Sequence, residues 1–567
     1  MYFQKNRRSI SAEILIKFMY PILKKINESQ FHKNQPPMKK TLLGFLLTAS
    51  MGWSTAGFAQ SDYPTLSQLN QRLQRVSSDA SATLTSLTKT AGGKDIWALK
   101  IGTGNLDYKP AIAVVGGVEG YDVLSVELAT QFAEKLIADH SEALENTTFY
   151  IFPNMSPDAY EQYHASLKYE RRGNAISVDH DRDGSPGDNG YTDLNGDGFI
   201  TLMRVEDPMG AYTISKEDER VLVKADRSKG EAGQYSLYPE SRDDDKDGKF
   251  AEDLKEGIAF NKSLTYKFPV FEPLAGDIPV SQLESRALLD YLFEQWNIFA
   301  FVTFSPANNL SSPLKYNAGN ARKRVVTSIL EQDQAINAMV SDIYNETISA
   351  KAYEQTNQGT DGDFFQWAYF HFARLSFSTP GYWTPDFKGK TDSQANFLAW
   401  ADSLGQEDVF IPWTEVSHPD FPGKKVEVGG IKPFAMSNPP YEQVAEIANE
   451  HTEFILKLAA IQPSLEVQNL KIESIGNGLT RISLDLFNNS PLPTHSEMGE
   501  RSRWLRKIRV DLDASEDRLI SGEKIQLIDV IPAYGKESLS WIIKGKGDVK
   551  LKAGASHAGI INATFKL

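Results

Sequence analysis

Continuous apolar runs and amphipathic stretches recur along much of this 567-residue chain. Residues 112–115 and 299–304 are short apolar runs, which are typical of strands buried on both faces of a sheet. Apolar residues recur at helical spacing over residues 123–136 and again over residues 444–458. The pattern predicts an α/β domain in which helices flank a mixed sheet.

A different pattern begins after residue 463. Short segments with strand-like composition are separated there by Gly, Asn, Pro and Asp, which favour turns. These segments are residues 465–472, 479–486, 504–512, 524–530, 538–543 and 559–565. Such spacing is typical of an antiparallel β-sandwich of roughly a hundred residues. We therefore predict a β-sandwich-like domain at residues 464–567.

Length and charge narrow the range of functions. A chain of 567 residues is too long for one hydrophobic core, so at least two domains are expected. The net charge of -14 argues against nucleic-acid binding, because no basic stripe is present to meet a phosphate backbone. The sequence has no cysteine, which excludes thiolate chemistry and disulfides, and its nine histidines show no paired metal-ligand spacing.

The N-terminal region is typical of an exported protein. Met38 is followed by two lysines, then by a mostly apolar run at residues 41–53 and by small residues up to Ala59. We predict a signal peptide at residues 38–59, cleaved near Ala59, behind a non-native leader at residues 1–37. No later apolar stretch approaches the ~20 residues that a membrane span needs, so the protein is expected to be secreted or periplasmic.

Three hexads of the form Asp-x-Asp/Asn-x-Asp-Gly lie within an acidic segment at about residues 179–253. Alternate oxygen-bearing side chains can converge on one hard cation, and glycine at the sixth position permits the sharp turn. The expected calcium ligands are Asp179, Asp181, Asp183, Asp193, Asn195, Asp197, Asp243, Asp245 and Asp247. Neither Arg204 nor Leu254, at the twelfth positions of the second and third loops, is the Glu of an EF-hand. The remaining oxygens would then come from Glu206, Glu252 or Asp253, and the alternative is an acidic surface loop without an ion.

Several segments, in order, resemble the zinc metallocarboxypeptidases of the carboxypeptidase A-like class. Residues 116–122 read Gly-Gly-Val-Glu-Gly-Tyr-Asp, where that family carries Gly-Gly-x-His-Gly-x-Glu. The other segments that resemble the family are residues 92–101, 110–117, 153–159, 257–262 and 279–288. The resemblance implies a carboxypeptidase-like α/β domain at residues 60–460, with the acidic segment as an insertion.

The same resemblance implies that the zinc site has been lost. The positions of the family's zinc ligands hold Glu119, Asp122 and Ser305. An all-oxygen set of this kind suits calcium or magnesium better than zinc.

The family's general base is also missing. Residues 363–369 and 377–383 resemble the strand that delivers this base, and its position falls on Gly381, or on Pro380 if the register shifts by one. A water there would have neither a strong Lewis acid nor a proton acceptor, so we expect no catalytic residue.

Part of the family's carboxylate-binding set is retained. The resemblance assigns this role to Arg171, Arg172, Asn261 and Lys262. The family has arginine at the position of Lys262, and lysine keeps the positive charge without the planar fork that grips a carboxylate through two bonds.

Three functional hypotheses follow. The favoured one is an exported, catalytically degenerate carboxypeptidase-like protein that binds a peptide or cell-wall-derived ligand in the residual cleft. The second is an active metallocarboxypeptidase or amidase with an atypical metal held by Glu119, Asp122 and Ser305. The third is a calcium-stabilised structural or adhesion protein whose cleft has no ligand.

Overall fold

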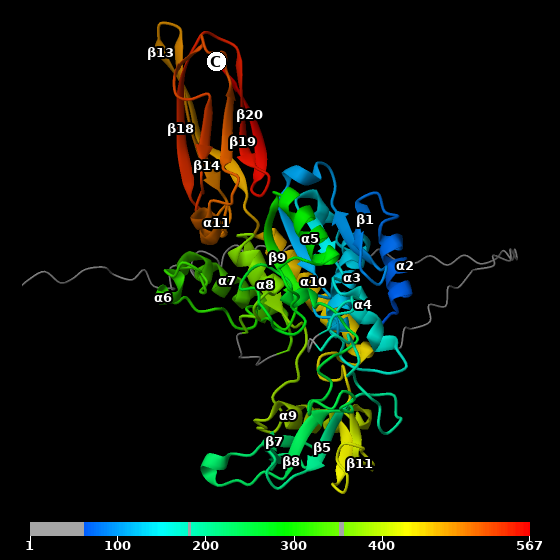
Figure 1. Cartoon of the computed structure of the whole chain (residues 1–567). Coiled ribbons are helices and arrows are strands. Elements are labelled where there is room, and N and C mark those ends of the chain that lie inside the picture. Colours follow the sequence, from blue (N-terminus) through cyan, green and yellow to red (C-terminus); the bar gives the residue numbers. More distant parts are fainter. Residues whose placement is uncertain (1–61, 180–182, 351–356) are drawn as a thin grey trace, which may run out of the picture. The chain divides into compact units, whose positions relative to one another are not determined.

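The structure is a computed structural model that describes residues 62–179, 183–350 and 357–567 (Figure 1). The predicted leader at residues 1–37, the predicted signal peptide at residues 38–59 and the predicted calcium ligand Asp181 lie outside the described residues. Within the described part of the chain, no helix is long and apolar enough to cross a membrane.

The larger α/β sheet has six strands in the order β1-β2-β4-β3-β9-β10. Their bounds are β1 Ala82–Lys89, β2 Asp95–Ile101, β3 Ala111–Val115, β4 Thr148–Phe152, β9 Ile298–Phe304 and β10 Leu375–Thr379. Strands β4, β3, β9 and β10 are parallel, whereas β2 is antiparallel to both β1 and β4. The carboxyl ends of the four parallel strands therefore lie at one edge, which is where α/β sheets bind ligands.

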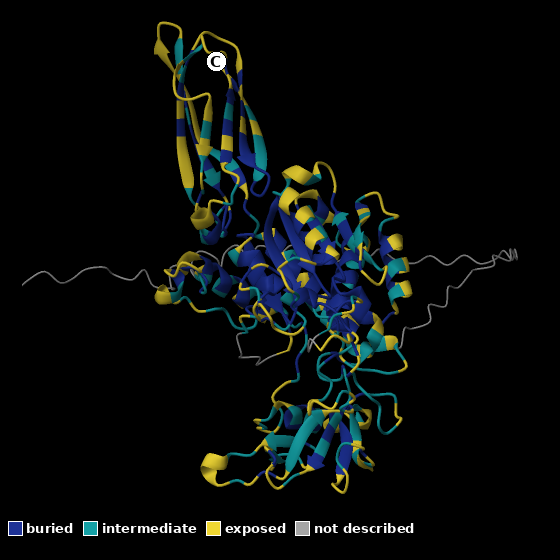
Figure 2. Ribbon diagram, viewed as in Figure 1, coloured by how far each residue is buried: buried dark blue, intermediate teal, exposed yellow. Residues whose placement is uncertain are grey.

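Helices cover both faces of this sheet, and the central strands are buried (Figure 2). Ile112 and Val114 face one core, while Ala113 and Val115 face the other, because successive side chains of a strand point to opposite sides. The first core includes α2 (Leu66–Val76), α3 (Val123–Ala138), α7 (Glu331–Thr347) and α10 (Tyr441–Ala460). The second includes α5 (Leu283–Glu294) and α8 (Phe364–Phe370). The mixed sheet flanked by helices is thus confirmed.

One expectation about this sheet was wrong. Residues 363–369 do not continue a strand, because Asp363 caps the N-terminus of α8 and the following residues are helical. The strand itself is limited to β10, and the aromatic residues of α8 pack beneath it.

A second sheet has six antiparallel strands in the order β11-β12-β5-β8-β6-β7. Its strands are β5 Leu202–Glu206, β6 Tyr212–Ile214, β7 Leu222–Lys224, β8 Tyr235–Pro239, β11 Phe410–Val416 and β12 Val426–Ile431. Helix α9 (Ser393–Ser403) packs in a small core with Val221. The segment predicted as an acidic insertion therefore contributes strands, and a distant part of the chain completes the sheet.

The C-terminal region has two four-stranded antiparallel sheets, β13-β14-β18-β16 and β17-β15-β19-β20, around one apolar core that contains Trp541. Their strands are β13 Leu465–Gly476, β14 Leu479–Asn488, β15 Ile508–Asp513, β16 Leu519–Ser521, β17 Ile525–Ile528, β18 Lys536–Lys544, β19 Asp548–Ala555 and β20 Gly559–Lys566. The remaining short helices are α4 Pro157–Tyr160, α6 Ala318–Ala321 and α11 Glu497–Ser502. The antiparallel character predicted for this region is confirmed, although β16 and β19 were not foreseen.

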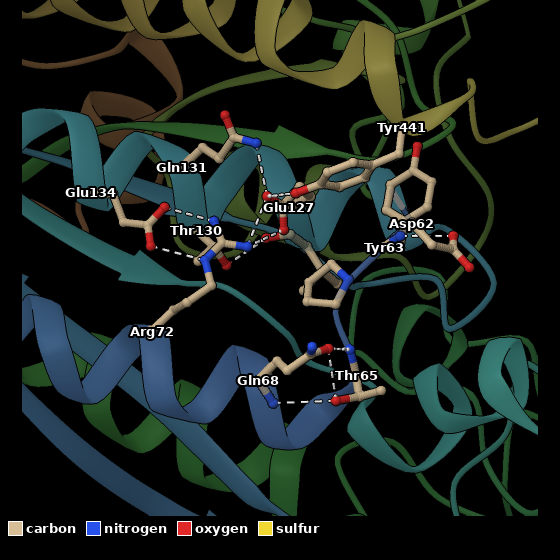
Figure 3. Close-up of polar contacts among 12 residues, drawn as sticks. Asp62, Tyr63, Thr65, Gln68, Arg72, Glu127, Thr130, Gln131, Glu134 and Tyr441 are labelled. Atoms are coloured by element: carbon tan, nitrogen blue, oxygen red, sulfur yellow. Dashed lines mark hydrogen bonds and ion pairs between the residues drawn. The ribbon is translucent and has the colours of Figure 1, made fainter. Parts of the chain in front are cut away.

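A buried ion pair joins three helices of the first core (Figure 3). Arg72 of α2 donates from Nη1 to Glu127 of α3, with 2.7 Å to Oε2, and from Nε and Nη2 to both oxygens of Glu134. Glu127 also accepts hydrogen bonds from the Tyr441 hydroxyl of α10 at 3.2 Å and from the Gln131 amide at 2.8 Å. Burial disfavours the charge of Arg72, but Glu134 and Glu127 hold its pKa above the usual value. The position of α3, and of the turn before it, therefore depends on this group.

We expect Arg72→Ala to lower the free energy of unfolding by about 3–5 kcal/mol, because Glu127 would remain buried without its cation. Arg75→Ala on the exposed side of the same helix is the matched control and should change stability by about 0.5 kcal/mol or less. Urea denaturation followed by circular dichroism measures both values. Equal small losses in the two variants would contradict the proposed importance of the ion pair.

Candidate functional site

The turn between β3 and α3 has no room for side chains at its first two positions. A Cβ on Gly116 would lie 2.4 Å from the backbone oxygen of Ser125. Gly117 adopts φ +60°, and a Cβ there would lie 2.6 Å from Oδ1 of Asn154. The two glycines therefore let the chain turn sharply at the carboxyl edge of the sheet, and Glu119 and Asp122 follow directly.

Glu119 is hydrogen-bonded to Asn261, one of the residues predicted to bind a carboxylate. Its Oε1 accepts from Nδ2 of Asn261 at 2.9 Å, and Oδ1 of Asn261 accepts from the backbone N–H of Phe364 at 2.9 Å. Burial raises the pKa of Glu119, while Asn261 and the charges of Arg172 and Lys262 oppose that rise. The structure thus brings together four of the predicted site residues, and the Asn261 side chain is already bonded at both ends.

Asp122 caps helix α3. Its Oδ1 accepts a hydrogen bond from the backbone N–H of Ser125 at 3.0 Å, which satisfies one of the free N–H groups at the helix start. The side chain is buried. Burial raises the pKa of Asp122 to about 7; the charge of Glu119 adds to this rise, and the Ser125 hydrogen bond opposes it. Asp122 therefore has a structural role that needs no metal.

Asp363 is a buried carboxylate of this region for which the sequence alone indicated no role. It accepts from the backbone N–H groups of Gln366 at 2.8 Å and Thr360 at 2.7 Å. Burial raises its pKa to about 7, its hydrogen bonds oppose the rise, and the charge of Glu119 contributes to it. The Asp-x-x-Gln pattern at residues 363–366 is a helix N-cap signal, but only the fold places it beside Glu119.

Ser305 is hydrogen-bonded to neighbouring groups, and Gly381 is closely packed. The Ser305 Oγ lies 2.9 Å from the Ser378 Oγ and accepts from the backbone N–H of Ala307 at 3.1 Å. Among the described residues it forms no hydrogen bond to Glu119 or Asp122. Gly381 has φ +74°, and a Cβ there would lie 2.6 Å from Leu128. A side chain at Gly381 would therefore meet the core beside α3.

The two neighbouring arginines have different surroundings. Arg171 donates from Nε to the backbone oxygen of Gly173 at 3.0 Å and from Nη2 to that of Asn174 at 2.7 Å, so its side chain braces the chain. The Arg172 guanidinium lies over the Tyr121 ring, 5.1 Å from its centroid. Within residues 62–179, 183–350 and 357–567, that guanidinium forms no hydrogen bond or salt bridge. Of the pair, Arg172 is therefore the one available to a ligand.

Arg172 lines a cavity of about 740 Å³. The other cations that line it are already paired: Arg220 with Asp218 and Asp402, and Lys432 with Asp408. The cavity also has aromatic walls, which include Tyr169, Tyr191, Tyr212, Phe410 and Trp413.

Carboxylates near Arg172 are engaged by other groups. Oε2 of Glu256 accepts from the backbone N–H groups of Arg172 and Gly173, both at 2.8 Å, and Oε1 of Glu170 accepts from that of Phe434 at 3.0 Å. Burial lowers the pKa of Arg172, but Tyr121 and then the carboxylates Glu119, Glu170 and Glu256 raise it above the usual value overall. The guanidinium is therefore held charged at the cavity wall.

Lys262 lies at the edge of this group. It is half-buried, and its Nζ lies 3.4 Å from the backbone oxygen of Pro273 and 3.9 Å from the Glu272 carboxylate. Its charge also opposes the raised pKa of Glu119.

The acidic hexads share one turn geometry. The first aspartate of each loop accepts a hydrogen bond from the N–H of the sixth-position glycine: Asp179 from Gly184, Asp193 from Gly198 and Asp243 from Gly248. In the third loop, ligand atoms of Asp243, Asp245 and Asp247 all lie within 4.8 Å of one another. In the second loop, the Asn195 amide donates to Asp197 at 2.8 Å. The residues described do not include Asp181, so the first loop is seen only in part.

The sequence model of the zinc carboxypeptidase family matches residues 68–201, which include both Glu119 and Asp122. Residues 68–201 belong to the metallocarboxypeptidase family. Residues 464–566, which form the two C-terminal antiparallel sheets, match a domain of unknown function (DUF8731). No curated protein sequence matches the chain.

Solved carboxypeptidase structures overlap the chain only loosely. Bovine thrombin-activatable fibrinolysis inhibitor, in complex with tick carboxypeptidase inhibitor, is 12% identical over 70% of this chain and 97% of its own, with a TM-score of 0.34. Carboxypeptidase A from Helicoverpa armigera is 14% identical over 61% of this chain and 73% of its own, with a TM-score of 0.36. The family assignment therefore depends on the sequence match and not on these overlaps.

The raised pKa of Asp122 predicts that the stability of the folded protein depends on pH. The folded state binds this proton more tightly than the unfolded chain, so ionisation of Asp122 lowers stability progressively as pH rises from ~4 to about 7. Asp122→Asn keeps a good helix cap without the charge and should be more stable than the native chain at pH 8, with little gain at pH 4.

Asp122→Ala is the control, because it removes the cap at every pH and should cost about 1 kcal/mol at pH 4. Urea denaturation of the three proteins at both pH values measures these differences. If the Asp122→Asn variant showed the same difference from the native chain at pH 4 and pH 8, the assigned direction of the pKa shift would be wrong.

Proposed function

We propose that this protein is an exported, catalytically degenerate metallocarboxypeptidase homologue that binds a peptide or cell-wall-derived ligand through the ligand's carboxylate. Arg172 carries the proposal. Its guanidinium is charged, lines an aromatic-walled cavity and has no hydrogen-bond partner among the described residues. A carboxylate could accept two parallel hydrogen bonds from this planar group.

The hydrogen bonds formed by the residues at the predicted zinc positions support the proposal that hydrolysis has been lost. Glu119 is bonded to Asn261, Asp122 caps α3, and Ser305 is bonded to Ser378 and to a backbone amide. None of the three offers the imidazole nitrogen that zinc favours, and the general-base position has no side chain. Arg172 therefore remains available to a ligand, while these positions lack the groups that activate water.

Ligand recognition is tested with peptides that have a free or an amidated C-terminus, using isothermal titration calorimetry. A free carboxylate should bind more tightly, and Arg172→Ala should cost ~1.5–3 kcal/mol of binding free energy for such peptides only. Arg172→Lys should recover part of this loss, because it restores the charge but not the fork. Lys432 lines the same cavity but is paired with Asp408, so Lys432→Met is the matched control.

Peptides that end in a D-residue, as in bacterial cell walls, distinguish a cell-wall ligand from an ordinary peptide. Equal affinity of every peptide for native protein and the Arg172→Ala variant would contradict carboxylate recognition at Arg172. Failure of the whole panel to bind would favour a structural protein instead.

Metal content tests the loss of hydrolysis separately. After dialysis against zinc and then against metal-free buffer, elemental mass spectrometry should find far less than one zinc per chain, because the former ligand positions lack imidazole. Hydrolysis of the same peptides should not rise when zinc is restored. Stoichiometric zinc with zinc-dependent peptide cleavage would instead establish the alternative of an active metallocarboxypeptidase or amidase.

A further inference from the structure

We propose that the third acidic loop forms one calcium site, with Asp243, Asp245, Asp247 and Glu252 as carboxylate ligands and Asn189 as an amide ligand. This inference concerns a different part of the molecule from Arg172 and does not depend on the proposed ligand-binding function. Three of the nine calcium ligands expected from the sequence, Asp243, Asp245 and Asp247, belong to this site.

The loop holds its carboxylates in a converging arrangement. Ligand atoms of Asp243, Asp245 and Asp247 lie within 4.8 Å of one another, a separation that one cation can bridge. Gly248 has φ +89°, and its N–H donates to Oδ2 of Asp243 at 3.1 Å, which closes the turn. The N–H of Asp247 similarly donates to Oδ1 of Asp245 at 3.1 Å.

Asn189 provides an independent indication of a ligand. Its side chain is completely buried, and its Nδ2 lies 2.8 Å from Oε1 of Glu252 and 3.3 Å from Oδ1 of Asp245. The amide is therefore directed into the acidic group, yet its own Oδ1 is buried with no hydrogen-bond partner. A buried polar oxygen without a donor is unfavourable, and a cation satisfies it. Rotation of the amide by half a turn about χ2 exchanges the two atoms and directs Oδ1 at the same centre.

Two carboxylate oxygens also lack a hydrogen-bond donor. Oδ1 of Asp243 and Oε2 of Glu252 are buried and have no hydrogen-bond partner. Asp243, Asp245 and Glu252 also form no salt bridge within the described residues, whereas Asp247 is paired with Lys249. Four carboxylates with one lysine leave an excess of negative charge that a divalent cation offsets.

The second loop provides a contrast within the same chain. The nearby buried acid there, Glu240, accepts hydrogen bonds from the backbone N–H groups of Leu194 at 2.7 Å and Thr201 at 3.0 Å. Its oxygens are thus satisfied by the protein, and neither they nor those of Asp193 are among the buried atoms that have no partner. The turn geometry alone therefore does not distinguish the two loops, whereas the unsatisfied oxygens do.

The chemistry of the ligands favours calcium. All the proposed ligand atoms are oxygens, which hard cations prefer, and the set includes neither imidazole nor thiolate. Calcium accepts six to eight oxygens in irregular geometry, so backbone oxygens and water can complete the set without a rigid octahedron.

Terbium, which replaces calcium and emits when an aromatic ring nearby absorbs light, provides the first test on the full chain. Phe250 follows the loop, and its ring centroid lies 4.7 Å from that of Tyr238. Terbium emission excited through tyrosine should therefore rise to a plateau at one ion per chain and be displaced by calcium. Tyr238→Phe should lower the emission without changing the calcium affinity measured by calorimetry.

Substitutions in the two loops test which residues bind the calcium ion. Asp245→Asn and Glu252→Gln should each weaken calcium binding on the order of tenfold or more, because affinity follows the number of charged ligands. Asp197→Asn in the second loop is the matched control and should leave calcium affinity unchanged. Circular dichroism shows whether each variant is folded, and a given calcium concentration should raise the melting temperature of the native chain by more than that of Asp245→Asn.

Two outcomes would overturn the proposal. One is the absence of calcium binding to the folded native chain at millimolar calcium, the range that weak extracellular sites require. The other is a loss of affinity in the Asp197→Asn variant equal to that in Asp245→Asn. Peptide binding at Arg172 is measured separately, so failure of either proposal can be told from failure of the other.

Discussion

A carboxylate that leaves water must regain hydrogen bonds or an opposite charge, and this requirement shapes the carboxyl edge of the larger sheet. Three buried or half-buried carboxylates lie there, Glu119, Asp122 and Asp363, and the charge of Glu119 raises the pKa of each of the other two. Each is compensated by donors from the protein itself: an asparagine amide, a helix N-terminus or a backbone turn. The position predicted from the family's metal site is thus held together by hydrogen bonds, while Arg172 lines the cavity.

The same requirement acts about one turn further into α3. Glu127 is fully buried and shares its oxygens among Arg72, Tyr441 and Gln131, so it links α2, α3 and α10. The helix that Asp122 begins is therefore fixed along its length by side chains that cannot shift without exposing a charge to the core. This rigidity holds the start of α3 and the turn before it, which carries Glu119, in one position.

Local sequence pattern was sufficient for the central strands β3 and β9, because short continuous apolar runs are typical of strands buried on both faces of a sheet. It failed for β19, where lysines alternate with small and apolar residues, and for the second sheet, in which the strands apart from β12 are only partly buried. For the site, motif order placed Glu119, Asp122 and Asn261 together. It did not show that Arg171 bonds to backbone while Arg172 faces a cavity, or that Asp363 lies beside Glu119, since both facts depend on contacts between distant segments.

The second sheet is assembled from two parts of the chain that are far apart in order of synthesis. Val205 of β5 pairs with Val426 of β12, and the last two strands of the larger sheet, β9 and β10, are made between them. Until β12 is present, β5 has an unpaired edge whose N–H and C=O groups can pair with another chain. A chain that stops before residue 426 therefore exposes that edge permanently, and such fragments should aggregate more readily than the whole chain.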